Sequence, residues 1–291
     1  AVAAKQYIHD HSPSWRNDKH AQQWTNTLTK YAEPIIGKLQ VRDIEVGHVL
    51  TILKPIWANK TETAKRVQGR IETILDWAKA HGYRDGENPA AWKGHLNKLL
   101  AAPTKVKKKK HFAALPAAQI GSFIKQLRQQ EGIGARALEF AILTAARSGE
   151  IRGATWQEID FKANVWTIPE ERMKAGKEHR VPLSARAIAL LKALPREQNA
   201  TLVFPAPRRG QLSDMTLTAV LRRMKIDATV HGFRSTFRDW TAELTNYPRD
   251  VAEMALAHTI GDRVEAAYRR GDLMEKRTAL MADWARFCAK H

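Results

Sequence analysis

The segment HGFRSTFRDWTAEL, residues 231–244, places an imidazole beside guanidinium groups on one predicted helix. With about 100° of rotation per residue, His231, Arg234 and Arg238 lie close together on one face. The predicted buried face consists of Phe233, Phe237, Trp240 and Leu244. An imidazole exchanges protons near neutral pH, and a guanidinium binds oxyanions through paired donors. Ordinary solvated surfaces also combine these residues, so this helix alone does not establish chemistry.

A second group of polar residues stands in LTAARSGEIRGATW, where Arg147 comes at the end of the most apolar predicted helix. An arginine is rare in such a place unless a carboxylate or phosphate meets it. Glu150 is a candidate partner. The pair is either a structural ion pair or an anion site that Glu150 orients, and the sequence leaves both interpretations open.

Three further residues are weak signals individually. Lys174 falls in a predicted hairpin turn, where a lysine is usually solvated, and His258 stands in ALAHTIGD. Tyr268 stands in EAAYRRGD, and a tyrosine after alanines on a helix is more often a half-buried packing residue. The informative feature is the order of all these residues along the chain.

In that order the chain resembles the tyrosine recombinases of the phage integrase family, in particular prophage and genomic-island integrases. The resembling stretches are LTAARSGEIRGATWQEID, MKAGKEHRVPLS, HGFRSTFRDW, LAHTIGDRVEAAYRRGD and RTALMADWA. They extend over residues 112–287. The preceding residues resemble the core-binding domain of that family only in their helical character.

The resemblance implies an enzyme that cuts and rejoins DNA without hydrolysis. Tyr268 would attack a backbone phosphate, forming a 3′-phosphotyrosyl link and releasing a 5′-hydroxyl, which conserves the bond energy for religation. Arg147 and Arg234 would hold the non-bridging oxygens of the phosphate. Lys174 would protonate the leaving 5′-oxygen as a general acid.

The resemblance gives the remaining site residues supporting roles. His231 is the candidate base for the phenol, whose ordinary pKa is about 10. His258 would hydrogen-bond a phosphate oxygen, and Glu150 would orient the cluster. We predict no metal ion and no nucleotide cofactor, because the arginines and the lysine already neutralise the charge.

The predicted function is integration or excision of a prophage or genomic island at double-stranded DNA attachment sites. The expected partners are those sites, a homotetramer in the synaptic complex and, as a further possibility, DNA-bending accessory proteins. Two alternatives stay open. One is a nicking-closing enzyme like the type IB topoisomerases, and the other is a DNA-binding protein without catalytic activity.

The composition supports a polyanionic partner. The 291 residues include 48 Lys and Arg against 30 Asp and Glu, a formal net charge of +18. No run of 18 apolar residues exists, so we expect a cytoplasmic protein without a membrane partner. The single cysteine, Cys288, forms no internal disulfide, and the eleven histidines lack metal-ligand spacing. Because the chain begins at Ala1, we expect a further N-terminal segment, and the presence of an arm-binding domain stays open.

The predicted fold is mainly α, a two-domain DNA clamp. Residues 1–101 should form an all-helical core-DNA-binding domain, 102–115 a basic linker, and 116–291 a mostly helical catalytic domain with a small antiparallel sheet. A run of lysines, which repel one another, predicts an extended linker that is either solvated or in contact with phosphates. The candidate DNA-binding residues are Lys65, Arg66, Arg70, Lys105, Lys107, Lys108, Lys109 and Lys110.

The spacing of apolar residues predicts individual helices and strands. Asn59 and Glu62 have capping-box spacing before a helix whose buried face is Ala64, Val67, Ile71, Ile74, Leu75 and Ala78. Val165 to Ile168 and the region of Val181 are typical of strands, and Pro182 confines its strand to an edge or an end. The tail 273–289 carries an apolar stripe that either completes its own domain or docks on a neighbouring protomer. The resemblance favours docking.

Overall fold

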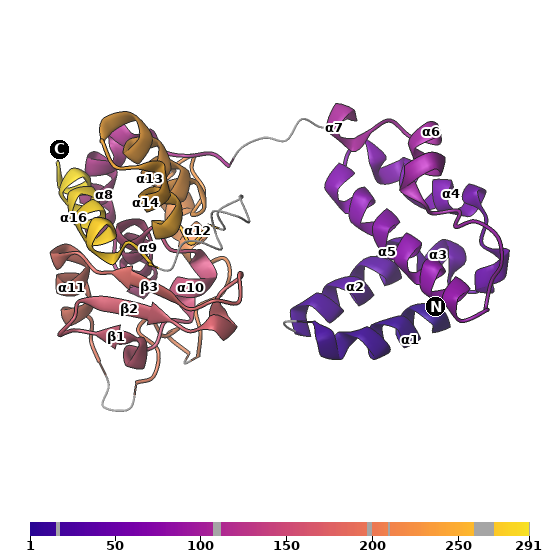
Figure 1. Ribbon diagram of the computed structural model, residues 1–291, viewed down its shortest axis with the longest axis horizontal. Coiled ribbons are helices and arrows are strands. Elements are labelled where there is room, and N and C mark those ends of the chain that lie inside the picture. The colour runs from indigo at the N-terminus through magenta and orange to yellow at the C-terminus, as the bar shows by residue number, and fades with distance from the viewer. Residues whose placement is uncertain (16–17, 107–111, 197–199, 209, 259–270, 291) are drawn as a thin grey trace. The chain divides into compact units, whose positions relative to one another are not determined.

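The computed structural model describes residues 1–15, 18–106, 112–196, 200–208, 210–258 and 271–290 (Figure 1). The chain forms two compact units, Ala1–Lys110 and His111–His291. The prediction of a mainly helical chain with one small antiparallel sheet is confirmed. Among the described residues, no helix is both long and apolar enough to cross a membrane.

The first unit has helices but no strand among its described residues, and its helices α4 and α5 pack on each other. Its helices are α1 (Val2–His11), α2 (Asp18–Tyr31), α3 (Glu33–Ile36), α4 (Val46–Trp57), α5 (Thr61–Ala80), α6 (Asn97–Leu99) and α7 (Pro103–Val106). All six residues predicted for the apolar face of α5 are buried. The predicted capping box is wrong, because α5 begins at Thr61 and the Thr61 hydroxyl donates to the Trp57 carbonyl at 2.8 Å.

The second unit surrounds one almost fully buried helix, α9, with helices and a three-stranded sheet. Its helices are α8 (Ile120–Arg128), α9 (Ile133–Thr144), α10 (Ser148–Arg152), α11 (Ala185–Lys192), α12 (Thr216–Arg223), α13 (Gly232–Leu244), α14 (Arg249–Ala255) and α16 (Met274–Ala289). Helices α8, α11, α12 and α16 all pack on α9. The core of this unit therefore has α9 at its centre.

The sheet is antiparallel in the order β1-β2-β3, with β1 (Ile159–Asp160), β2 (Val165–Ile168) and β3 (His179–Pro182). The predicted hairpin is confirmed: Val165 is opposite Pro182, and the proline ends the edge strand β3, where its missing N–H removes no hydrogen bond from a further strand. Strand β1 was not predicted, because two residues are too few to show an alternating pattern.

The end of the predicted linker is fastened to the start of α13. The Ala113 carbonyl accepts from the Thr229 amide at 2.9 Å, and the Leu115 carbonyl accepts from the Thr236 hydroxyl at 2.6 Å. At Gly232 a Cβ atom would lie 2.0 Å from the Ala113 oxygen, so only glycine permits this approach. Residues 113–115 of the predicted linker thus pack on the second unit.

Helix α16 completes the core of its own domain. Leu280 and Trp284 are fully buried, and the Trp284 indole N–H donates to the Ile142 carbonyl of α9 at 2.8 Å. The Trp284 ring also meets Phe237 of α13 edge-on, with centroids 5.4 Å apart. The expectation that this apolar stripe docks on a neighbour is therefore wrong, because the stripe is already covered within the chain.

The apolar face of α13 is shorter than the sequence pattern indicates. Phe233, Phe237 and Trp240 are buried as predicted, whereas the side chain of Leu244 is 60% exposed. Leu244 is the last residue of the helix, and the chain leaves the core there.

We expect Trp284→Ala to lower the free energy of unfolding by about 3 to 5 kcal/mol, because it opens a cavity in the core and removes the indole hydrogen bond to the Ile142 carbonyl. Leu244→Ala is the control, and should change it by less than about 0.5 kcal/mol. Chemical denaturation followed by circular dichroism measures both values. Equal effects of the two substitutions would contradict the assignment of α16 to this core.

Candidate active site

Arg147 is held at the corner between α9 and α10. Helix α9 ends at Thr144, three residues before the predicted end at Arg147, and the left-handed Ala145 (φ 51°) turns the chain. Glu150, in the first turn of α10, accepts from the Arg147 amide at 2.7 Å and from its Nη1 at 2.8 Å. The buried Glu150 carboxylate thus caps α10 and orients the guanidinium at once.

Arg234 lies on α13 with only 5% of its surface exposed. Its Nη1 donates to the Ala145 carbonyl, and its Nη2 donates to the Leu256 carbonyl at 2.6 Å. Burial, and then the charge of Arg147, lower the pKa of Arg234 to about 10. The guanidinium therefore stays protonated at neutral pH, and its buried Nε has no hydrogen-bond partner among the described residues.

Two alanines with left-handed backbone hold the two arginines. Ala145 presents its carbonyl to Arg234, and Ala257 (φ 47°) presents its carbonyl to Arg147 Nη2 at 3.1 Å. A left-handed non-glycine residue costs roughly 1 kcal/mol or more and persists only where its surroundings enforce it. Each strained corner here supplies an acceptor to a charged donor, which compensates the strain.

His258 follows directly after Ala257 and joins the same cluster. Its Nε2 lies 3.2 Å from Arg234 Nη2, and its Nδ1 lies 2.7 Å from the Glu253 carboxylate of α14. We call Arg147, Arg234 and His258 the anion cluster. All three come from segments that the core of the second unit brings together.

His231 stands at the N-cap of α13, beside the anion cluster, with its ring 4.7 Å from that of Phe112. Its pKa is lowered by partial burial and then by the positive charges of Arg234, Arg147, His258 and Lys174. The lowered pKa keeps the imidazole neutral near pH 7, which is the form that accepts a proton.

Lys174 is exposed in the segment between β2 and β3, and its charge acts on His231. The start of this segment is fixed, because Met173 is buried and the Arg172 guanidinium donates to the Glu150 carbonyl and to the Glu158 carboxylate. Lys174 thus follows directly after two residues that are anchored to the fold, one of them to α10.

The predicted DNA-binding residues separate into two groups. Lys65, Arg66 and Lys105 are exposed on α5 and α7. Arg70 is 8% exposed, donates to the Gln23 carbonyl at 2.7 Å and lies over the Trp24 ring. Its inclusion among the DNA-binding residues is therefore a wrong prediction, since its guanidinium is used within the fold. Tyr268 and Lys107–Lys110 lie outside the described residues.

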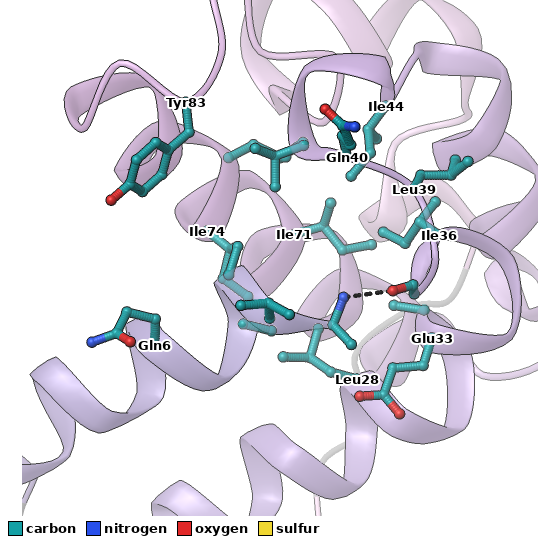
Figure 2. Close-up of a pocket in the computed structure, with 18 of the residues that line it drawn as sticks. Gln6, Leu28, Glu33, Ile36, Leu39, Gln40, Ile44, Ile71, Ile74 and Tyr83 are labelled. Atoms are coloured by element: carbon teal, nitrogen blue, oxygen red, sulfur yellow. Dashed lines mark hydrogen bonds between the residues drawn. The ribbon is translucent and has the colours of Figure 1, made fainter.

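A pocket in the first unit lies apart from these residues. It has a volume of about 640 Å³ and a largely apolar lining that includes Leu28, Ile36 and Ile71 (Figure 2). None of the candidate catalytic residues that the structure describes lines it, so the cavity and the anion cluster are separate features.

Sequence reasoning missed two residues beside the site, Glu253 and His179. Burial, and then the charge of Arg277, lower the pKa of His179 in β3 to about 4, although its imidazole donates to the Ala255 carbonyl. The hydrogen bond joins the hairpin to the end of α14. No local sequence pattern marks either residue. His179 pairs with the distant Ala255, and Glu253 contacts His258 only because of the turn after α14.

Comparisons with known proteins identify the family. The phage integrase family model matches residues 114–273, and the phage integrase central domain matches residues 1–95. The integrase of Enterobacteria phage P4 is 30% identical over 300 residues, covering 95% of this chain and 66% of that protein. The prophage integrase IntZ of Escherichia coli K12 is 31% identical over 278 residues, covering 92% and 66%.

The chain therefore belongs to the phage integrase family. It spans about two thirds of the length of these two relatives. A lambda integrase dimer bound to a COC′ core site has a TM-score of 0.68 at 18% identity, covering 93% of this chain and 95% of that chain. A lambda integrase tetramer bound to a Holliday junction has a TM-score of 0.69 at 17% identity, covering 90% and 78%. These likenesses show a shared fold.

The lowered pKa of the partly buried His179 predicts a loss of stability in acid. Between pH 6.5 and about 4 the unfolded chain binds a proton at this residue that the folded chain does not, so the free energy of unfolding falls as the pH falls. We expect this contribution to reach about 1 to 3 kcal/mol. Relative to His179→Gln, which keeps a donor but does not titrate, the wild type should lose this stability between pH 6.5 and about 4, as denaturation at a series of pH values would measure. Parallel curves would contradict the assignment.

Proposed function

We propose that this protein is a tyrosine-type site-specific recombinase that cuts and rejoins DNA through a 3′-phosphotyrosyl intermediate. The observation that carries the proposal is the anion cluster, in which two charged arginines and a histidine converge at one end of α9. Membership of the phage integrase family and the net charge of +18 support it. The biological outcome would be integration or excision of a prophage or genomic island.

The arginines suit the binding of a phosphodiester. Some N–H donors of each guanidinium are used to hold it in place. Arg147 donates to Glu150 and Ala257, and Arg234 donates to Ala145 and Leu256. A guanidinium has five donors, so donors are left for the non-bridging oxygens. Because the guanidinium groups are already oriented, they stabilise the charge of the transition state without reorganisation. One such donor lowers the activation free energy by about 3 kcal/mol.

Proton transfer completes the reaction. The phenol oxygen of Tyr268 forms a bond to phosphorus while the bond to the 5′-oxygen breaks, and the DNA strand stays attached through its 3′-phosphate. The neutral His231 takes the phenol proton, and Lys174 gives a proton to the leaving 5′-oxygen. Religation is the same sequence in reverse, so no nucleotide is consumed.

DNA binding would use both units. We assign the first unit as the core-DNA-binding domain, with Lys65, Arg66, Lys105 and the lysines 107–110 on phosphates, and the second as the catalytic domain. A homotetramer on paired attachment sites is the proposed active assembly, by analogy with the lambda integrase tetramer on a Holliday junction. DNA-bending accessory proteins are included as further partners, and the place of action is the bacterial cytoplasm.

A type IB topoisomerase-like activity would use the same cluster but would not need two paired sites. The matched family model and the integrase relatives favour recombination. A DNA-binding protein without activity could use the same donors on a backbone phosphate, but it would have no use for Tyr268 as a nucleophile.

We expect a nicked suicide substrate to trap a covalent protein–DNA adduct with the wild type and none with Tyr268→Phe, because the phenylalanine has no nucleophilic oxygen. Denaturing gel electrophoresis detects the adduct, and peptide mapping locates it. The control is Tyr247→Phe, whose hydroxyl donates to Asp283 at 2.7 Å and should be dispensable. An adduct with Tyr268→Phe would disprove the assignment of the nucleophile.

Lys174→Ala should lose activity on ordinary DNA but recover most of it when sulfur replaces the bridging 5′-oxygen, because a thiolate leaves without a proton. We expect a defect of about 10²- to 10⁴-fold on the oxygen substrate. Single-turnover cleavage rates measure both. Lys177→Ala is the matched control, and equal defects of Lys174→Ala on the two substrates would exclude the general-acid role.

A further inference from the structure

Glu253 contacts His258 on the side away from Arg234. The two residues share a hydrogen bond of 2.7 Å between Oε2 and Nδ1, and the His258 amide also donates to the Glu253 carbonyl at 3.0 Å. The other carboxylate oxygen of Glu253 accepts from Arg238 Nε at 2.8 Å. With 17% of its side chain exposed, the carboxylate is largely withdrawn from water.

The partners of the ring determine where its proton lies. An ionised carboxylate only accepts, so Nδ1 must carry a proton toward Glu253. A guanidinium only donates, so Nε2 must accept from Arg234 Nη2. Both contacts are satisfied only by the neutral imidazole with its proton on Nδ1.

Several positive charges lie near the Glu253–His258 pair. His258 contacts Arg234, and Glu253 contacts Arg238 and Arg249. Arg147 donates to the carbonyl of Ala257, the residue before His258. Burial raises the pKa of Glu253, but its hydrogen bonds to Arg238 and His258 and their charges outweigh burial and leave that pKa below its ordinary value. Glu253 is the carboxylate hydrogen-bonded to His258 within the described part of the chain.

A phosphate oxygen changes what the ring must do. Such an oxygen accepts hydrogen bonds, so it cannot pair with the lone pair on Nε2. His258 can bind it only after Nε2 has taken up a proton, and the ring then carries a positive charge among the arginines. A neighbouring carboxylate stabilises that charged form.

We propose that Glu253 is a positioning residue that keeps the proton of His258 on Nδ1 and balances the charge of the ring when Nε2 binds a phosphate oxygen. The second half of this proposal rests on the proposed function, which supplies the phosphate. The first half concerns the protein alone. A purely structural interpretation would make Glu253 only an acceptor for Arg238.

The first test determines which ring nitrogen of His258 carries the proton. Long-range ¹H–¹⁵N spectra of protein labelled with ¹⁵N-histidine separate the two neutral forms of an imidazole, and the spectrum of His258→Gln assigns the signal. We expect a single neutral form with the proton on Nδ1 in the wild type, and a mixture of both neutral forms in Glu253→Ala, where only the 3.2 Å contact with Arg234 still favours Nδ1. Glu253→Gln should keep the proton on Nδ1, because its amide oxygen still accepts.

The second test measures single-turnover cleavage of the suicide substrate. We expect Glu253→Gln to lower the rate about ten- to a hundredfold, as when the carboxylate partner of a metal-bound histidine is removed. Glu243→Gln, an exposed position on α13 with the same change of charge, should cleave like the wild type. Arg238→Gln removes the other partner of Glu253 and should leave the His258 ring and the rate within about twofold of the wild type.

The results separate the two proposals. A wild-type proton on Nε2, a rate for Glu253→Gln equal to that of the wild type, or an equal loss in Arg238→Gln would each overturn the role of Glu253. If the wild type forms no adduct at all, the proposed function fails, while the histidine spectra still decide the first half. Should Glu253→Ala not fold, as thermal melting would show, the isosteric Glu253→Gln and the wild-type spectrum carry the decision.

Discussion

The second unit depends on keeping the guanidinium of Arg234 charged while it is buried. Withdrawal from water costs several kcal/mol for an unpaired ion, so the surrounding backbone must supply acceptors. Those acceptors are the carbonyls of Ala145, at the end of α9, and Leu256, after α14. One side chain thus ties α13 to the end of α14 and to the end of α9, where Ala145 lies 89 residues before Arg234 in the sequence.

Several local features follow from this constraint. The chain takes the left-handed conformation at Ala145 and again at Ala257, each next to a residue of the anion cluster. Each carbonyl that these corners expose meets an arginine, so strain and electrostatic stabilisation occur at the same places. Two carboxylates also contact the cluster, Glu150 at Arg147 and Glu253 at His258, and each partly balances the positive charge of its partner.

The sequence predicted those parts of the molecule that depend on short-range periodicity. The buried face of α5 and the β2–β3 hairpin follow from spacings of three to four and of two residues. Arg70 and Leu244 were misassigned because periodicity gives a face but not what packs against it. His179 could not be recognised, since its partner is brought to it by the tertiary fold. Glu253 could not either, since its contact with His258 depends on the turn that follows α14. For Arg147, the sequence left a structural pair and an anion site as alternatives, and the structure shows that Glu150 and the Ala257 carbonyl share one guanidinium.

The position of α16 has a consequence for thermodynamics. Because Trp284 fills the core of its own chain, folding of the second unit is a unimolecular process whose equilibrium does not depend on protein concentration. Any association of protomers is a separate equilibrium that does depend on concentration and that must use surface outside this core. Substitutions on that surface can therefore strengthen or weaken assembly without a matching change in the stability of the single chain.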